Sequence, residues 1–203
     1  MAPLYDLLDW PFEPMYRPGR RLLGRAAVGH TLELGAGTGK NFPYYGPAAR
    51  VVALDITWEM LAHARRRLRP PIHALLVADV AHLPIRDACV DTVVAAFVCC
   101  VQADPSPPLG EIARVLRPGG QTLFLEYVLP RHGWRRPLMR VLEPPLRILY
   151  GVHWDHDLPA LLASAGLQVL EVRAVWASIV QAIFAAHAVN PGSRVVRKER
   201  DSE

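Results

Sequence analysis

Residues 31–41 read Thr-Leu-Glu-Leu-Gly-Ala-Gly-Thr-Gly-Lys-Asn, and this stretch decides the fold class. It begins as a short, mostly apolar strand and runs into a glycine-rich turn. Gly35, Gly37 and Gly39 remove every Cβ from one side of that turn, so a nucleotide-like ligand can lie against the backbone. Open α/β sheets bind ligands at this position, beyond the carboxyl end of a strand. The stretch therefore predicts a ligand site at the end of a parallel strand.

The glycine spacing and the acid before it narrow the choice of ligand. The pattern is G-x-G-x-G, whereas dinucleotide-binding turns carry G-x-G-x-x-G and hold a pyrophosphate on a helix N-terminus. Glu33 stands two residues before the first glycine. Its carboxylate would repel a pyrophosphate and attract the ammonium or sulfonium group of an amino-acid-derived cofactor. A tight turn without a ligand is the alternative interpretation.

Two further acids follow later strands. Asp55 lies twenty residues beyond Gly35, at the end of the second expected strand, where a carboxylate can accept hydrogen bonds from both ribose hydroxyls. Asp79 follows the third strand and could accept a hydrogen bond from an adenine amino group. A helix cap is the alternative role for Asp55, and a turn cap for Asp79. An apolar slot for the base is expected from Ile56, Met60, Val80 and Phe97.

Short β-forming runs alternate with segments of helical period, which is typical of a parallel sheet with crossover helices. We expect strands at 30–34, 51–55, 74–78, 91–98, 121–127, 167–172 and 175–186. Helices are expected at 58–68, 107–116 and 157–165, with a turn at 117–120 that closes the second of them. The chain contains no internal repeat and no linker. It is therefore predicted to be a single α/β domain over residues 1–203.

The composition excludes several classes of protein. The chain has 203 residues, 51% of them hydrophobic and 21% charged, which is enough apolar surface for a core and excludes a disordered chain. Its three cysteines are too few for a disulfide scaffold. No run approaches the roughly 18 apolar residues of a membrane-spanning helix, and the acidic N-terminal stretch is unlike a signal peptide. A cytoplasmic enzyme is the expectation.

The order and spacing of these motifs resemble those of class I S-adenosylmethionine (SAM) dependent methyltransferases. The resemblance is strongest to the group that contains the ubiquinone and menaquinone C-methyltransferases, small-molecule thiol methyltransferases and bacterial phospholipid N-methyltransferases. It extends over about residues 30–127 and is carried by the segments 33–39, 52–61, 78–84, 90–96 and 113–120.

The resemblance implies a Rossmann-like, seven-stranded sheet in the order 3-2-1-4-5-7-6 with the last strand antiparallel. It also implies SAM as cofactor and S-adenosylhomocysteine as product. Glu33 would bind the methionine end, Asp55 the ribose and Asp79 the adenine. Tyr5 resembles a tyrosine that folds over the cofactor in relatives. The backbone of the site is expected to include Gly35, Ala36, Gly37, Gly39 and Ala78.

The acceptor of the methyl group is expected near the end of the fifth strand. Glu126 would lie close to the methyl as a catalytic group, although a carboxylate paired with an arginine is the alternative. The chain has no spare residues for a cap domain. We therefore divide it into an N-terminal lid (1–25), a SAM-binding core (26–128), a substrate lid (129–157) and a C-terminal helix, hairpin and basic tail (158–203). The lid residues expected to contact substrate are Trp134, Tyr150, His153 and His156.

The histidines at 153 and 156 stand near Asp155 and Asp157 and at first suggest a metal site. Zinc needs further nitrogen or sulfur ligands, and none has a recognisable spacing, so no metal is predicted.

Basic residues are concentrated in one segment. The formal net charge is +4, and residues 130–150 alone hold five arginines and one glutamate. Together with the aromatic and apolar residues of 1–25, this composition is typical of a segment at a membrane interface. Peripheral membrane contact through 1–25 and 129–150 is therefore predicted, with a soluble lid as the alternative. No nucleic-acid-binding module is present, so a nucleic-acid partner is not expected.

We therefore predict transfer of a methyl group to a small apolar or lipidic acceptor: a thiol, a quinol or a phospholipid head group. Two alternatives remain open. One is a SAM-binding module that does not catalyse transfer, and the other is a nicotinamide-dependent oxidoreductase, against which Glu33 and the glycine spacing speak. The sequence does not indicate an oligomeric state.

Overall fold

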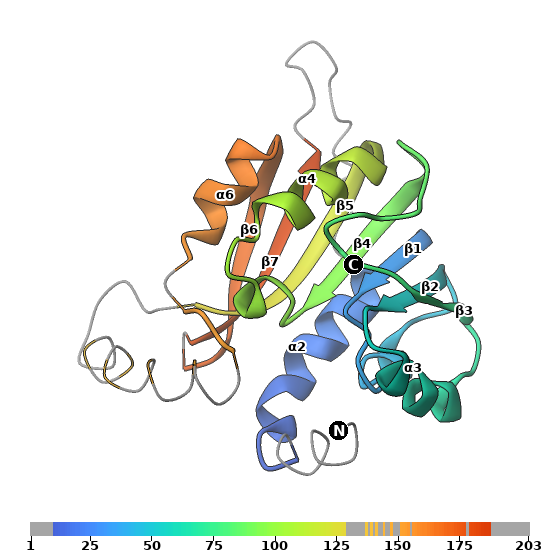
Figure 1. Cartoon of the computed structure of the whole chain (residues 1–203), viewed down its shortest axis with the longest axis horizontal. Coiled ribbons are helices and arrows are strands. Elements are labelled where there is room, and N and C mark those ends of the chain that lie inside the picture. Colours follow the sequence, from blue (N-terminus) through green and yellow to red (C-terminus); the bar gives the residue numbers. More distant parts are fainter. Residues whose placement is uncertain are drawn as a thin grey trace, which may run out of the picture.

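The computed structural model describes residues 10–128, 137, 139, 141, 144, 147, 151–154, 156–177 and 179–187. Its centre is a seven-stranded sheet in the order β3-β2-β1-β4-β5-β7-β6 (Figure 1). The strands β1 to β5 pair in parallel, and β7 is antiparallel to both of its neighbours. The strand bounds are Gly29–Leu34, Ala49–Asp55, Ile72–Val77, Val90–Ala96, Leu116–Tyr127, Leu167–Trp176 and Val180–His187 for β1 to β7. The predicted sheet order and the antiparallel last strand are confirmed.

The two middle strands are buried because helices cover both faces of the sheet. β4 reads Val-Asp-Thr-Val-Val-Ala-Ala and is buried at every position except Asp91. Such a continuous β-branched and apolar run is typical of a strand in the interior of a parallel sheet. β1, its neighbour, is buried from Thr31 to Leu34. The glycine turn therefore leaves the sheet from the buried carboxyl half of β1.

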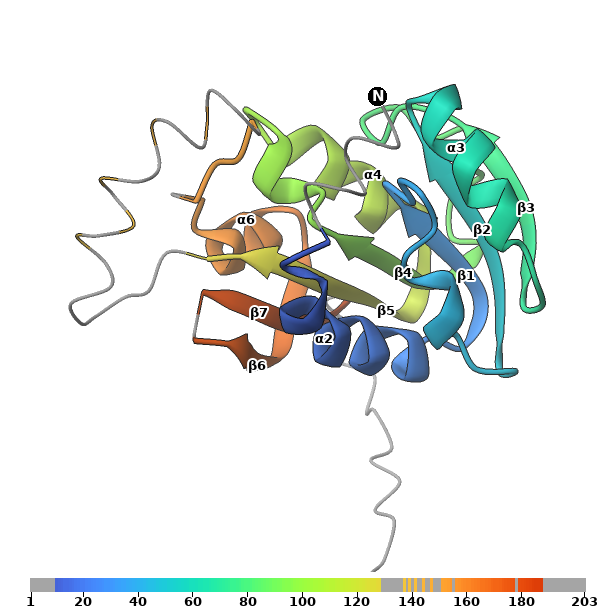
Figure 2. The ribbon, with the colours of Figure 1, turned by 90° about the horizontal axis from the view of Figure 1, so that it is seen from below.

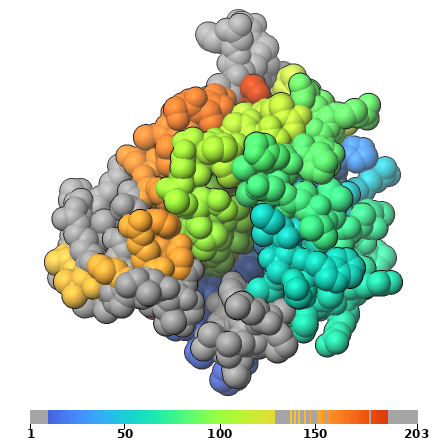
Figure 3. All heavy atoms as spheres, in the orientation of Figure 1, coloured from blue at the N-terminus to red at the C-terminus, as the bar shows by residue number. Residues whose placement is uncertain are grey.

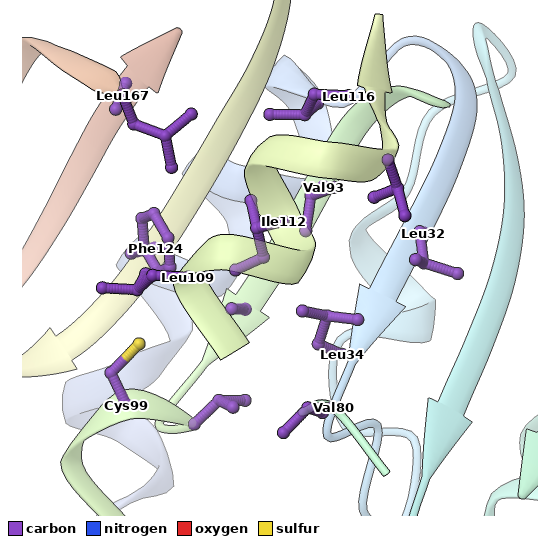
Figure 4. Close-up of a cluster of buried hydrophobic side chains, with 14 of the residues drawn as sticks. Leu32, Leu34, Val80, Val93, Cys99, Leu109, Ile112, Leu116, Phe124 and Leu167 are labelled. Carbon is purple, nitrogen blue, oxygen red and sulfur yellow. The ribbon is translucent and has the colours of Figure 1, made fainter. Parts of the chain in front are cut away.

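Helices α4 (Ser106–Val115) and α6 (Leu158–Ser164) cover one face of the sheet. Figure 4 shows Leu109 and Ile112 of α4 next to Phe124 of β5, and the space-filling view shows α4 and α6 side by side on this face (Figure 3). Leu109, Ile112 and Phe124 are each at most 1% exposed. This cluster is the larger part of the hydrophobic core.

Helix α2 (Glu13–Ala26) lies on the opposite face of the sheet from α4 and α6 (Figure 2), and the buried residues of α3 (Trp58–Ala64) belong to the same core cluster as those of α2. Tyr16 and Leu23 of α2 are buried in one apolar cluster with Leu125 of β5, and Leu61 of α3 belongs to the same cluster. Gly19 permits this packing, because a Cβ there would stand 2.4 Å from the Cδ1 atom of Leu125. In the described part of the expected N-terminal lid, residues 13–25 thus belong to a helix packed on the sheet.

Two expected boundaries are wrong. Residues 117–120 were expected as a turn but belong to β5, which pairs with β4 at Leu116 and again from Gln121, with an irregular register between them. The last hairpin turns at 177–179 and not near 173–174. Ala177 adopts φ 49°, and the Ile179 N–H donates to the Trp176 carbonyl. The β-branched residues 172 and 175 continue one strand, so the local pattern contained no turn residue to mark the change of direction.

Three short 3₁₀ helices complete the described elements: Phe42–Tyr44, Arg65–Arg67 and Cys99–Val101. The expected helix 58–68 is therefore α3 followed by the second of these turns. Among the described helices, none combines the length and the hydrophobicity that crossing a membrane requires.

Candidate functional site

The glycine turn follows β1 at the carboxyl edge of the parallel strands. Gly35, Gly37 and Gly39 all have positive φ, at 61°, 54° and 81°. A Cβ on Gly35 would stand 2.7 Å from Val98, and one on Gly39 would stand 2.8 Å from the Phe42 ring, so these two glycines are required by close packing. A Cβ on Gly37 would meet no atom within 4 Å. The turn therefore presents bare backbone to open space at Gly37.

Asp55, the last residue of β2, joins the turn to the next strand. Its Oδ2 atom accepts a hydrogen bond from the Gly37 N–H at 2.8 Å, and its Oδ1 atom accepts one from the Thr57 N–H at 2.9 Å. A carboxylate offers about four lone-pair positions, so both oxygens can still accept from a ligand. The side chain thus holds the turn that leads into α3 and remains available at the glycine turn.

Glu33 is completely buried beneath the turn. Its Oε1 atom accepts a hydrogen bond from the Asn41 side-chain amide at 2.8 Å, whereas Oε2 makes no hydrogen bond of normal geometry with any described residue. Burial raises the pKa of this carboxyl to about 7, although the Asn41 hydrogen bond acts in the opposite direction. The neighbouring Tyr45 hydroxyl also lowers this pKa, and because Oε2 has no hydrogen bond of normal geometry, this oxygen can still accept from a ligand donor.

Residues that the sequence argument missed complete this buried polar group. The Arg20 guanidinium, from α2, donates to Asn41 Oδ1 at 2.7 Å and is only 6% exposed. Burial, and then the charge of Glu33, raises the pKa of the Tyr45 hydroxyl, which also lacks a hydrogen bond of normal geometry. Asn41 and Tyr45 closely follow the glycine turn in the sequence, and this closeness could have identified them. The sequence carries no such signal for Arg20, because only the fold brings α2 under the turn.

Most residues expected around an adenine follow β2 or β3, but Met60 lies on α3, and Phe97 follows β4 and packs with Tyr16 and Tyr127 instead. Ile56 is 65% exposed beside Asp55, and Met60 and Ala78 are half-buried. Asp79 is exposed and accepts a hydrogen bond from the Ala81 N–H at 2.9 Å, so it caps its own turn. Val80 belongs to the main core. Their contact with a cofactor, like that of Ala36 in the glycine turn, stays a prediction.

An aromatic cluster lies at the carboxyl ends of β4 and β5. It consists of Tyr16, Phe97, Tyr127 and Trp154, which come from α2, the residue after β4, the end of β5 and the segment before α6. The Phe97 ring centroid is 4.8 Å from that of Tyr16 and 4.9 Å from that of Tyr127. The hydroxyl groups of Tyr16 and Tyr127 are hydrogen-bonded to each other. Phe97 has φ 58°, an uncommon conformation for a non-glycine residue.

Arg20 connects this aromatic cluster to the buried polar group. Its guanidinium carbon lies 5.6 Å from the Phe97 ring centroid and 5.9 Å from that of Tyr16, within cation–π range. The same guanidinium donates to Asn41, which donates to Glu33. A chain of contacts therefore runs from the floor of the glycine turn to the aromatic cluster.

Glu126, the predicted catalytic group, is 1% exposed. Its Oε1 atom accepts hydrogen bonds from the N–H groups of Val98 and Cys99 at 2.9 and 2.8 Å, and Oε2 accepts one from Cys100 at 3.1 Å. Burial raises its pKa, and these N–H donors oppose that effect. The carboxyl group thus holds the turn that follows Phe97, and a catalytic role for it stays a prediction.

The two histidines expected near the substrate pack on the same turn. The His153 N–H donates to the Cys100 carbonyl at 2.6 Å, and the His156 Nε2 atom lies 3.0 Å from the Gln102 carbonyl oxygen. Their rings stack at 5.5 Å. Within the described part of the chain, no three histidine, cysteine, aspartate or glutamate side chains are grouped to hold a metal ion. Tyr5, Trp134 and Tyr150, which were also expected at the site, lie outside the described residues.

The arrangement fits SAM on two independent observations. The Oε2 atom of Glu33, which has no hydrogen bond of normal geometry, offers an acceptor to an ammonium group, and the bare backbone at Gly37 leaves room for a nucleoside. Asp55 stands beside that space at the end of β2.

Comparison with known proteins agrees with this geometry. Residues 32–124 match a family described as a methyltransferase domain. The chain is 33% identical over 176 residues to phosphatidylethanolamine N-methyltransferase of Cereibacter sphaeroides, covering 82% of this chain and 85% of that protein. It is 34% identical over 129 residues to a human thiol S-methyltransferase, covering 61% of this chain, and spans about half (53%) of the length of that relative.

The fold is similar to that of solved methyltransferases. A SAM-dependent methyltransferase from Aquifex aeolicus superposes with a TM-score of 0.69 at 19% identity, covering 92% of this chain and 98% of the other. This likeness and the match in sequence exclude the nicotinamide-dependent alternative. The chain belongs to the methyltransferase-domain family, and it is a SAM-dependent methyltransferase of the class I fold.

Proposed function

We propose that the chain transfers the methyl group of SAM to a small apolar or lipidic acceptor: a thiol, a quinol or a phospholipid head group. The observation that carries this proposal is the cluster of Tyr16, Phe97, Tyr127 and Trp154. Sites for apolar ligands are lined by aromatic side chains with a few polar groups among them. The relatives named above act on a phospholipid or on thiols, which agrees with an acceptor of this kind.

In this proposal the donor and the acceptor lie next to each other, and the sheet topology supports that arrangement. The glycine turn follows β1, Phe97 follows the neighbouring β4, and Tyr127 ends β5 beyond it. Because β1, β4 and β5 are parallel, all three ends lie at the same edge of the sheet. The cofactor would lie over the ends of β1 and β2, with Glu33 at its methionine end, Asp55 at the ribose and Asp79 at the adenine. The acceptor would then approach from the side of β4 and β5.

The reaction needs little covalent help from the protein. In an in-line displacement the lone pair of the acceptor forms the new bond to carbon, while the carbon–sulfur electrons return to sulfur. Holding the two reactants in line can lower the barrier by about 7–11 kcal/mol. We therefore assign the aromatic cluster a positioning role toward the acceptor, and the proton of a thiol or quinol leaves to solvent.

Turnover of labelled SAM with alkyl thiols, quinols and phosphatidylethanolamine tests the acceptor class. Trp154→Ala should lower kcat/KM for the acceptor while S-adenosylhomocysteine still binds normally. Trp176→Ala is the matched control, because that tryptophan is 41% exposed on β6 and takes part in none of the ring contacts of the cluster. No turnover with any acceptor would favour a SAM-binding module without catalysis. An equal effect of both substitutions would remove the cluster from the acceptor site.

We also propose that the enzyme works at a membrane surface, through 1–25 and 129–150. In the described part of these segments, Arg17, Arg21 and Arg25 are exposed and stand four residues apart on α2, so they share one helix face. Trp10 is 74% exposed and Phe12 44% exposed just before that helix, and Val141 is 72% exposed. Basic and aromatic side chains together favour an anionic bilayer interface.

Co-sedimentation with anionic and neutral vesicles tests the membrane contact. Binding to anionic vesicles should weaken with salt, since the Debye length shrinks from ~10 Å at 0.1 M to ~3 Å at 1 M. It should also weaken when Arg17, Arg21 and Arg25 are changed to glutamine together, or when Arg135, Arg136 and Arg140 are changed to alanine. The control changes Arg65, Arg66 and Arg69, which are exposed near α3, to glutamine. Absence of lipid-dependent sedimentation would leave both segments as ordinary soluble lids.

A further inference from the structure

A surface pocket of about 270 Å³ lies at the amino ends of the strands, at the opposite edge of the sheet from the glycine turn. Its apolar floor includes Leu32, Val52 and Ile85. Apart from Thr31, the polar part of its lining is basic and consists of His30, Arg50, Arg86 and Arg117. The methyl-transfer site uses none of these residues.

The basic side chains converge because of the sheet register. His30 of β1 is paired with Arg50 of β2, and paired residues of adjacent parallel strands point to the same face of a sheet. Arg86 comes from the loop between β3 and β4, and Arg117 from the start of β5. Four separate parts of the chain thus bring cationic or titratable groups to one pocket.

The acids near this pocket are already occupied. Asp91 accepts from Arg117 at 2.6 Å and from the backbone N–H of His30 at 2.8 Å. Asp87, which follows Arg86, pairs with Arg114 at 2.5 Å. Within the described residues, Arg50 and Arg86 form no ion pair. Two guanidinium groups therefore face one pocket without a carboxylate to balance them.

We propose that this pocket binds a small phosphate-type oxyanion. Guanidinium groups match the oxygens of a phosphate in paired hydrogen bonds, and a bound anion would balance the charges of Arg50 and Arg86. Pockets for drug-sized ligands have roughly 300–1,000 Å³, so a volume just below that range suits a small anion. The apolar floor excludes water from one side of the ion and so strengthens its attraction to the guanidinium groups. The phosphate could be free or part of a glycerophosphate head group.

Isothermal titration and thermal unfolding of the full chain test the site. The probes are inorganic phosphate and glycerol 3-phosphate, with chloride at matched ionic strength as the reference. Phosphate should bind and raise Tm. Arg50→Gln and Arg86→Gln should each weaken binding about tenfold or more, since each removes a charge-assisted hydrogen bond. The control variants Arg65→Gln and Arg66→Gln remove the same charge from exposed positions outside the pocket.

The outcomes answer two questions: whether the site exists, and whether the phosphate that it binds is free or part of a head group. Tighter binding of glycerol 3-phosphate assigns the site to a head group, and equal or weaker binding assigns it to free phosphate. Both support a phosphate site. Binding that is unchanged in both pocket variants, weakened equally in the control variants, or absent from the wild type would overturn the proposal. Since Arg86 stands exposed on a loop, Arg86→Gln alone suffices if the Arg50 variant does not fold.

Discussion

Replacing Glu33 by glutamine should change how the stability of the protein depends on pH. Glu33 is fully buried, and its pKa is about 7 in the folded protein against an ordinary value of 4.5. The folded protein therefore keeps this proton up to about pH 7, whereas the unfolded chain releases it near pH 4.5. The free energy of unfolding of the wild type should fall as pH rises through this window, since the folded state binds more protons there.

The size of the effect follows from the two pKa values. At about 1.4 kcal/mol for each pKa unit, the difference between 4.5 and about 7 corresponds to roughly 3 kcal/mol. Part of this stabilisation is already lost at pH 5. Between pH 5 and pH 8 the free energy of unfolding should therefore fall by about 2–3 kcal/mol more in the wild type than in Glu33→Gln. Urea unfolding of both proteins without ligand, at both pH values, measures this difference. The contributions of the titratable groups that the two proteins share cancel when their stabilities are subtracted.

An opposite case provides the control. The hydrogen bond from Arg173 lowers the pKa of the exposed Glu171. Relative to a variant without that carboxyl, the wild type should therefore become slightly more stable as pH rises, which is opposite to the effect of Glu33. Parallel stability curves for wild type and Glu33→Gln would refute the reasoning, because they would mean that the fold does not hold a proton on Glu33.

The same carboxyl should govern cofactor binding. An ammonium group needs Glu33 ionised, so wild-type affinity for S-adenosylhomocysteine should fall as pH drops below about 7, and the affinity of Glu33→Gln should not. At pH 8 the substitution should weaken binding about tenfold or more, since it removes a charge-assisted hydrogen bond. A larger loss for SAM than for S-adenosylhomocysteine would show that Glu33 also senses the sulfonium charge. Equal losses would restrict its role to the amino group.

Three further predictions test the neighbouring groups. Asp55→Ala should weaken binding of S-adenosylhomocysteine by about 2–4 kcal/mol in calorimetry, because the ribose hydroxyls would lose a charged acceptor, and unchanged affinity would remove Asp55 from the site. Gly37→Ala should weaken the same binding because its Cβ enters the open space at the turn, whereas Gly119→Ala, also at positive φ with nothing within 4 Å, should cost stability alone. Glu126→Gln should lower the free energy of unfolding by about 1–3 kcal/mol in urea, because its amide would face backbone N–H donors; a stability like that of the wild type would contradict this structural role.

Local sequence determined the parallel sheet and the cofactor edge. The apolar, β-branched run of β4 and the three glycines after β1 favour their local conformation over only a few residues. Their spacing was therefore sufficient to predict the fold class and the positions of Glu33 and Asp55. The hairpin turn near Ala177 was misplaced because no glycine, proline or asparagine marks it, and its position depends on how β6 and β7 pair.

Only the tertiary structure decided what surrounds those residues. Arg20, Tyr16 and Trp154 are distant in sequence from the glycine turn, and α2 and the segment before α6 bring them to the ends of β4 and β5. The state of Glu33 was also undetermined by the sequence. A glutamate before a glycine turn can be ionised in water or protonated in a core, and the choice depends on how completely the packed chain excludes solvent from it.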